Sequence, residues 1–497
     1  MTRRGRVGAA ALAACAALAL ASPAAAQLLI TSTGQSGASM PAAAQGVPPA
    51  SGAMPRLTPD AVLQSVDRAL PLLEQVRQDV ARARGEVTEA QGAFDFKVKA
   101  EALTSRGYYD NERAKSVFEQ PLAALGMTTY GGYRTSSGLF APYDGKAATL
   151  SDGEVMAGVG LPLLRNRRVD ARRTDVRVAE IGVGIAERGL DKARLSYFKE
   201  ALAEYWDWVA AGQQQRIARA LLDIAEARDT QLADAVALGQ VAPVERTDNR
   251  RAILQRRSAL VSAGRQLELQ SIDLSLFLRD PSGAPTRPAA DLLPDLPRPV
   301  AGPDPDEAAE IATALERRPE LRAVRLKRDQ QEAELRLAEN GILPALDLVS
   351  EVSRDYGSGP ESRRGTVFEA GLAFELPMQR RKASGKSAQI QAKLSALAQE
   401  LRWTEDRVRA DVQDALSARR AARAVLDVVS EEVQVARELE QLERDRFALG
   451  DSTQFLVNLR ELATADALAR EARALADYQK ALVSVESATG RLLDRVP

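Results

Sequence analysis

The side chains available for chemistry in this chain are carboxylates, lysines, arginines and hydroxyls. The 497 residues include no His and a single Cys, Cys15. Histidine is the commonest general base near neutral pH and a frequent metal ligand, so its absence excludes Ser-His-Asp triads and zinc sites of the His/Cys type. We therefore expect no enzyme and no catalytic, cofactor-binding or metal-binding residue. A hydrolase that uses only carboxylates stays open as an alternative.

The overall charge gives no sign of a nucleic-acid partner. The chain has 67 basic and 68 acidic residues, whereas nucleic-acid binders carry a basic surplus. Aromatic residues make up only 4% of the chain, which is low for the thick core of a large enzyme.

Apolar side chains alternate with charged, polar or small ones in four short segments, at residues 93–103, 153–163, 344–354 and 366–377. A period of two predicts strands with one apolar and one polar face. Each segment has about the ten residues that a tilted strand needs to cross a bilayer. We expect residues 111–151, which are rich in Gly, Ser and Tyr, to form a loop.

The elements that must position these strands are long helices. Residues 169–238 and 382–449 contain no Pro and little Gly, which predicts two helices of about 70 residues, roughly 105 Å each. We expect hairpin turns at 239–243 and 450–453. Helices of this length cannot be buried in one compact domain and must pack along neighbouring helices.

The chain repeats one layout of helix, strand, strand, long helix, turn and helix. The first repeat spans 57–280, a Pro-rich connector spans 281–305, and the second repeat spans 306–497. Internal duplication of this kind defines the architecture. The residues that correspond between the repeats are Pro71 and Pro319, Pro162 and Pro377, and Gly239 and Gly450.

The first 26 residues have the pattern of a secretory signal peptide. Arg3, Arg4 and Arg6 precede an Ala- and Leu-rich run, and small residues end it at Ala26. Residues 27–56 are expected to be a flexible lead-in. Lipidation of Cys15 is an open alternative, because Leu12 to Cys15 is similar to a lipoprotein cleavage box.

Strands with this alternation fit a membrane barrel, in which apolar side chains face lipid and polar side chains face the lumen. Four strands cannot close a barrel, and open strand edges in lipid leave unpaired backbone groups. Several chains would therefore have to contribute strands to one barrel.

The mature chain resembles the TolC-like outer membrane efflux proteins over about residues 58–492. The stretches that carry the resemblance are two helix-hairpin turns, a helix opening and a closing helix. They read Leu238-Gly239-Gln240-Val241-Ala242-Pro243-Val244-Glu245, Phe447-Ala448-Leu449-Gly450-Asp451, Arg318-Pro319-Glu320-Leu321, and Asp477-Tyr478-Gln479-Lys480-Ala481-Leu482 continuing to Ala488-Thr489-Gly490-Arg491-Leu492-Leu493.

The resemblance implies a mainly α fold with a membrane β part, in a homotrimer. Each chain would give four strands to a 12-stranded β-barrel in outer membrane lipid, and its helices would form a third of a periplasmic α-helical barrel. The charged strand residues would line the lumen: Asp95, Lys97, Lys99, Glu101, Glu351, Glu369 and Glu375.

The resemblance also implies partners and a passive mechanism. The channel would conduct substrates from a periplasmic adaptor (membrane fusion) protein and an inner-membrane transporter of RND or ABC type to the exterior, in efflux or type I secretion. The adaptor would dock at the hairpin turns, on Gly239, Ala242, Pro243, Gly450 and Asp451. The nature of the cargo stays open.

One stretch departs from the pattern of that family. Family members often carry acids on the helix that lines the closed periplasmic entrance, where this chain has Val457 and Arg460, with Glu461 adjacent. Arg460 and Glu461 are therefore candidate entrance-lining residues, with an ordinary solvated helix face as the alternative. For the chain as a whole, a soluble periplasmic coiled-coil adaptor or scaffold is the second hypothesis.

Overall fold

The computed structural model describes residues 56–300 and 302–496. The expected signal peptide, Cys15 and all but the last residue of the lead-in at 27–56 lie outside the described residues. None of the described helices combines the length and the apolar run that a membrane-spanning helix requires. The described residues fall into two compact units. We call Glu86–Ala179 with Gln331–Ala392 the strand unit, and the remainder the helical unit.

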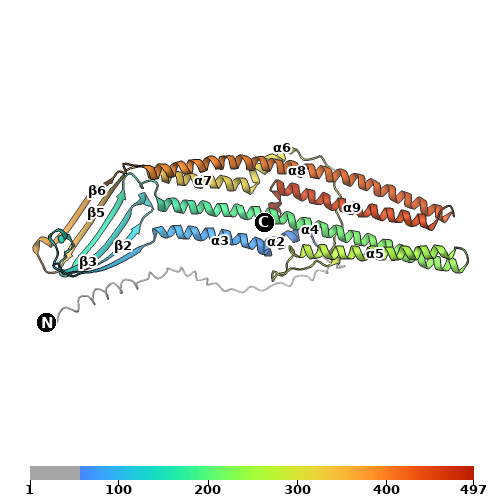
Figure 1. Ribbon diagram of the computed structural model, residues 1–497, viewed down its shortest axis with the longest axis horizontal. Helices are drawn as coiled ribbons and strands as arrows, with labels where there is room; N and C mark the ends of the chain where they lie inside the picture. The colour runs from blue at the N-terminus through green and yellow to red at the C-terminus, as the bar shows by residue number, and fades with distance from the viewer. Residues whose placement is uncertain (1–55, 301, 497) are drawn as a thin grey trace, which may run out of the picture. The chain divides into compact units, whose positions relative to one another are not determined.

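The strand unit is built on one antiparallel sheet of six strands in chain order, β1-β2-β3-β4-β5-β6 (Figure 1). The first repeat supplies β1 to β4 and the second supplies β5 and β6, so the pairing of β4 with β5 joins the repeats. The strands are β1 Lys97–Ser105, β2 Asn111–Pro121, β3 Thr128–Gly138, β4 Gly153–Pro162, β5 Ala345–Tyr356 and β6 Gly365–Glu375.

Two expectations about this sheet are wrong. Residues 111–151 are not a loop but contain β2 and β3, so the sheet of the described chain has six strands rather than four. The first strand starts at Lys97, because residues 92–94 form a 3-10 helix and Asp95 caps it. The alternating pattern is weak in β2 and β3, where polar and small residues occupy both faces, and pairing with β1 and β4 determines their structure instead.

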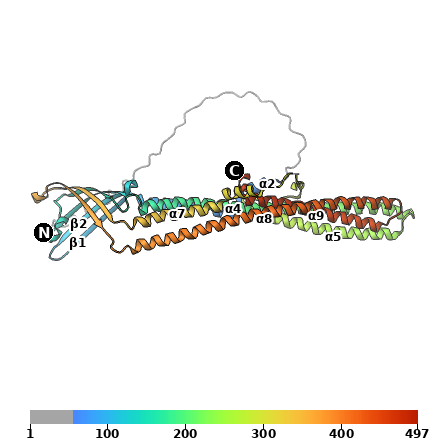
Figure 2. The same ribbon diagram turned by 90° about the horizontal axis from the view of Figure 1, so that it is seen from above.

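The described helices include two long ones, α4 with 67 residues and α8 with 68. Each is followed by a shorter partner, so that α4 with α5 and α8 with α9 form two helical hairpins (Figures 1 and 2). The helices are α2 Pro59–Ala69, α3 Pro71–Gln91, α4 Ala171–Ala237, α5 Pro243–Ser275, α6 Glu307–Arg317, α7 Pro319–Asn340, α8 Arg381–Ala448 and α9 Gln454–Ala488.

Prolines break the helix in the same way in both repeats. Leu70 and Arg318 have extended backbone angles, and each directly precedes the proline that starts the next helix. The proline ring disfavours helical angles in the residue before it, so the two breaks follow from the sequence.

The core of the helical unit contains the few large aromatic side chains of α4. Phe198, Tyr205 and Trp208 are fully buried and pack with α2 residues such as Leu63. The hydroxyl of Tyr205 donates a hydrogen bond to the backbone oxygen of Leu57 at 2.8 Å, and burial raises the pKa of that hydroxyl. The low aromatic content therefore does not mean an absence of a packed core.

Candidate functional site

The six strands give the sheet two chemically different faces. Opposite residues in an antiparallel pair point to the same side, and neighbours along a strand point to opposite sides. Following the pairings across the sheet places Lys97, Lys99, Glu101, Glu351, Glu369 and Glu375 on one face. Of the seven expected lumen residues only Asp95 lies outside the strands.

The same face carries further polar side chains that the sequence patterns did not single out. The Tyr130 hydroxyl on β3 donates a hydrogen bond to Glu351 on β5 at 2.9 Å, across the one intervening strand, β4. Arg134 pairs with Glu154, and Lys99 pairs with Glu119 at 2.8 Å. All of these residues fall on the charged side when the register is followed, so we call this side the polar face.

The opposite side, the apolar face, exposes large hydrophobic side chains. On β6, Phe368, Leu372 and Phe374 are 70%, 66% and 64% exposed. Exposed apolar surface of this extent marks contact with another apolar phase or protein. The small and apolar residues of the face include Val98, Ala100, Ala102, Ala114, Phe118, Gly131, Tyr133, Val155, Ala157, Val159, Leu161, Leu346, Leu348, Val352, Phe368, Ala370, Leu372 and Phe374.

The two hairpin turns of the helical unit share one backbone geometry. Gly239 and Gly450 have φ of 70° and 83°, in the left-handed region that favours glycine. The next amides, of Gln240 and Asp451, each donate 2.9 Å bonds back to the carbonyls five residues earlier, which defines a Schellman helix end. The expected docking residues therefore occupy equivalent turns, and their docking role stays a prediction.

The two turns differ in how the following helix begins. In the first turn Ala242 is extended and Pro243 opens α5, which suits the missing proline N–H. In the second turn the side chain of Thr453 accepts a hydrogen bond from the amide of Leu456, which caps α9.

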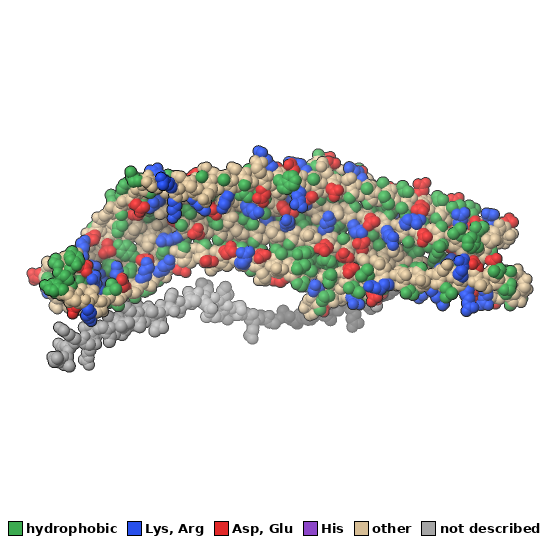
Figure 3. All heavy atoms as spheres, viewed as in Figure 1, with side chains coloured by type: hydrophobic (Ala, Val, Ile, Leu, Met, Phe, Trp, Pro, Cys, Tyr) green, Lys and Arg blue, Asp and Glu red, His purple; other side chains and the backbone are tan. Residues whose placement is uncertain are grey.

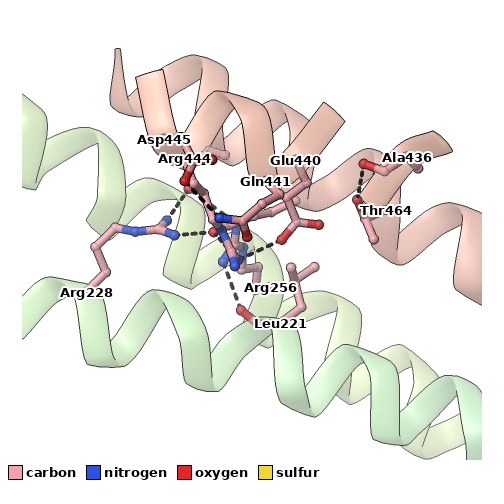
Figure 4. Close-up of polar contacts among 11 residues, drawn as sticks. Leu221, Arg228, Arg256, Ala436, Glu440, Gln441, Arg444, Asp445 and Thr464 are labelled. Atoms are coloured by element: carbon pink, nitrogen blue, oxygen red, sulfur yellow. Dashed lines mark hydrogen bonds and ion pairs between the residues drawn. The ribbon is translucent and has the colours of Figure 1, made fainter. Parts of the chain in front are cut away.

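Beside these turns, four helices meet at one buried carboxylate. Glu461 of α9 is 1% exposed and accepts charge-assisted hydrogen bonds from Arg228, from Arg256 at 2.9 Å and from Arg444 at 3.0 Å. These arginines belong to α4, α5 and α8, and Figure 4 shows them converging. We call Glu461 and its three arginines the hairpin network, because it joins both helical hairpins.

Further polar contacts hold the arginines of the hairpin network in place. Arg256 donates to the backbone oxygen of Leu221 at 2.8 Å, and Arg444 pairs with Glu440 at 2.7 Å (Figure 4). Asn458 accepts from Arg228 at 2.8 Å and from Arg256 at 3.3 Å. The sequence alone did not identify these partners.

The electrostatics of the hairpin network favour the ionised form of Glu461. Burial alone raises the pKa of this carboxyl, but the hydrogen bonds and positive charges of Arg228 and Arg256 outweigh burial, and the pKa of Glu461 is lowered. The carboxylate is therefore charged at neutral pH and bound tightly by cations.

The two candidate entrance residues lie in different environments. The side chain of Arg460 is 40% exposed, and its Nε lies 3.9 Å from the carboxylate of Glu443. Glu443 also accepts a hydrogen bond from Ser452 near the second turn. Arg460 thus lies at the surface of the second hairpin, while Glu461 is enclosed, so the two do not form one exposed charged pair.

In the part of the chain that the structure describes, no group of three or more Cys, Asp or Glu side chains is arranged to hold a metal ion. Charged side chains of both signs are interspersed over the face of the helical unit seen in Figure 3.

Several solved structures with a similar arrangement of long helices and antiparallel strands are outer membrane channels. The fold is similar to that of CmeC from Campylobacter jejuni (TM-score 0.57, 15% identity, covering 87% of this chain and 85% of that one). VceC from Vibrio cholerae gives 0.58 at 14% identity, covering 87% and 96%. MtrE from Neisseria gonorrhoeae gives 0.58 at 16% identity, covering 87% and 88%. The chain therefore has the TolC-like channel fold. This confirms the expected mainly α class with a β part, but not the expected four strands per chain.

A comparison with protein families matches the second repeat of the chain. Residues 311–491 match the family described as Outer membrane efflux protein; a search of curated proteins gave no match. The match covers most of the second repeat. Together with the fold, it agrees with the resemblance found in the sequence and with the expected outer membrane channel.

Proposed function

We propose that three copies of this chain assemble into one passive conduit through the outer membrane, with no catalytic step. The observation that carries the proposal is the two-faced sheet: charged side chains line one side and large exposed apolar side chains cover the other. In a closed wall, the apolar face would contact lipid and the polar face would surround water.

The hairpin turns would receive a periplasmic adaptor protein, which would link the channel to an inner-membrane transporter of RND or ABC type. Gly239, Ala242, Pro243, Gly450 and Asp451 are the proposed docking residues. Their support is the matched geometry of the two turns and the apolar side chains beside them, since Leu238 and Leu449 are 71% and 79% exposed.

The hairpin network would hold the periplasmic entrance closed. It connects α4 and α5 with α8 and α9 through one buried carboxylate, so separating the hairpins requires breaking its ion pairs. We place Glu461 in this closing contact and assign Arg460 to the neighbouring surface.

The first experiment compares two arginine substitutions on neighbouring residues of β6. Leu372→Arg puts a charge on the apolar face, where an arginine near the middle of a bilayer costs about 2–4 kcal/mol. Gly371→Arg puts the same charge on the polar face, where no neighbouring atom lies within 4 Å of the added Cβ. We expect Leu372→Arg to reduce outer membrane insertion and Gly371→Arg to preserve it.

The second experiment measures conduction. Purified protein reconstituted in planar bilayers should form ion-conducting channels, and Gly371→Arg should change their ion selectivity. A protein that stays in solution without detergent and conducts no ions would refute the channel proposal and favour a soluble periplasmic adaptor. Deleting the gene should sensitise the cell to exported compounds or abolish secretion.

A further inference from the structure

The sheet of the strand unit ends in two open edges. Strand β1 pairs only with β2, and β6 pairs only with β5. Both edge strands are exposed along almost their whole length, and neither contains a proline. Unpaired backbone groups along a regular strand bind another strand, and in lipid they must be paired.

Charge on the polar face is divided between the two halves of the sheet. Strands β4 to β6 contribute acids and no bases, and the bases lie on β1 to β3, where they outnumber the acids. The bases are Lys97, Lys99, Arg113, Lys115 and Arg134, accompanied by the acids Glu101 and Glu119. The acids of the other half are Glu154, Asp347, Glu351, Asp355, Glu369 and Glu375.

This division makes the two edges complementary. The β1 edge presents Lys97, which forms no ion pair within the described residues, and the β6 edge presents Glu375 and Glu369. On the apolar face the β1 edge carries the small residues Ala100 and Ala102, whereas the β6 edge carries large ones. The occupant that matches each edge in charge and size is the opposite edge of a second copy.

We propose that β6 of one copy pairs antiparallel with β1 of the next, so that three copies close an 18-stranded wall. The inference rests on the proposed trimeric channel and extends it. The four strands per chain expected from the sequence would have given twelve. The direction of the strands agrees, because six antiparallel strands in chain order leave β1 and β6 running in opposite directions.

Electrostatics select the register of this junction. Pairing Glu375 with Lys97 or with Lys99 places opposite charges side by side. Starting from the register that joins Glu375 to Lys97, a shift of two residues away from Lys99 would place Glu369 opposite Glu101. Like charges directly opposite each other are destabilising.

Barrel geometry selects the same registers independently. The pairings place Lys97 and Glu369 in one row across the sheet. Joining Lys97 to Glu375 therefore staggers each copy by 375 − 369 = 6 residues. With neighbouring strands about 4.8 Å apart and a rise of about 3.3 Å per residue, this stagger tilts the strands by about 35° from the barrel axis. Joining Lys99 to Glu375 gives a tilt of about 43°. The like-charge register gives about 25°, below the usual range of about 35–45°.

Eighteen strands would make the outer membrane part of the conduit wide. At a tilt of about 40°, the backbone of the wall would enclose a diameter of about 36 Å, compared with about 24 Å for twelve strands. Conduits of this strand number leave an aqueous channel, so the extra hairpin of β2 and β3 would enlarge the exit for cargo.

Cysteine crosslinking tests the junction in the full-length protein. Position 15, in the expected signal peptide, holds the natural cysteine. Ala100→Cys with Leu372→Cys tests the register that joins Lys97 to Glu375, and Ala100→Cys with Phe374→Cys tests the register that joins Lys99 to Glu375. Oxidation in isolated outer membranes should shift most of the chain to dimer and trimer bands for one of these pairs.

The matched control is Ala100→Cys with Gly371→Cys, which uses the same strands but places the two thiols on opposite faces. It and the single variants should remain monomeric on denaturing gels. As a second readout, Glu375→Lys should weaken the native trimer. Combining it with Lys97→Glu or with Lys99→Glu, according to which cysteine pair crosslinks, should restore the trimer.

The outcomes separate this inference from the proposed function. A crosslinked ladder and restoration by the charge exchange support the 18-stranded wall. Conducting trimers without a ladder from either pair would overturn this junction and leave the channel proposal standing. Protein that neither conducts nor forms trimers would overturn both.

Discussion

Replacing Glu461 by Gln removes the one carboxylate that binds arginines from three other helices. The substitution keeps the shape of the side chain but leaves Arg228, Arg256 and Arg444 facing a neutral amide. Arg256 is itself only 3% exposed, so water cannot replace the lost partner. We expect the contact between the two hairpins to weaken strongly.

The size of the effect follows from burial. Breaking a buried ion pair by removing one partner costs about 3–5 kcal/mol, because the remaining charge is left uncompensated. Glutamine retains an acceptor oxygen, which favours the lower end, about 3 kcal/mol. A change of 1.4 kcal/mol is about tenfold in an equilibrium constant, so the ratio of closed to open entrances should fall by roughly a hundredfold.

Single-channel conductance in planar bilayers measures this ratio. Glu461→Gln should raise the open fraction strongly. Glu432→Gln is the matched control, because Glu432 pairs with Arg470 at 2.6 Å while both side chains are about half exposed, and such surface pairs contribute about 0–1 kcal/mol. An unchanged open fraction in Glu461→Gln, with the protein folded and conducting, would refute the closing role of the hairpin network.

Three further predictions follow from the helical unit. Arginine contacts lower the pKa of Glu461 below its ordinary value of 4.5. The stabilisation is therefore fully present above that ordinary value and is lost as pH falls through the lowered pKa. On acidification into that range, the open fraction should rise in the wild type and not in Glu461→Gln. Gly239→Ala and Gly450→Ala should each destabilise the hairpins by about 1–2 kcal/mol, because positive φ strains a residue with a Cβ. As a contrast, Gly189→Ala, in open space within α4, should stabilise the protein by about 0.5–1 kcal/mol. Thermal unfolding measures whether each substitution lowers or raises the stability. Trp208→Ala, at a fully buried position, should cost about 3–5 kcal/mol in denaturant unfolding, and a smaller loss would mean that the core collapses around the cavity.

The parts of the fold that the sequence predicted are those in which local pattern and environment agree. Strand β6 alternates large apolar with charged or small residues, and each set faces a different environment. The helix stop at Gly239 requires a backbone conformation that glycine adopts easily. Strands β2 and β3 lacked such a signal: β3 reads TTYGGYRTSSG, and its glycines allow close approach of neighbouring side chains such as Phe118 at Gly131.

The hairpin network could not be predicted from the sequence, because its members are distant in the chain. Arg228 and Arg256 lie 233 and 205 residues before Glu461. Each is an ordinary arginine in a charged helix, and only the packing of the two hairpins buries them together. The sequence singled out Glu461 through its neighbour Arg460, but gave no means of telling the enclosed side chain from the exposed one.

The extra strands in the first repeat obey a constraint that the rest of the strand unit imposes. Helices α3, α4, α7 and α8 all have one end in the strand unit, at the start of β1, the end of β4, the start of β5 and the end of β6. One added strand would reverse β4 and bring α4 to the opposite end of the strands. A hairpin adds two strands and preserves every direction, so inserting β2 and β3 widens the sheet without moving any helix connection. Because the number of strands stays even, β1 and β6 also remain antiparallel. This is the condition for β6 of one copy to pair antiparallel with β1 of the next copy.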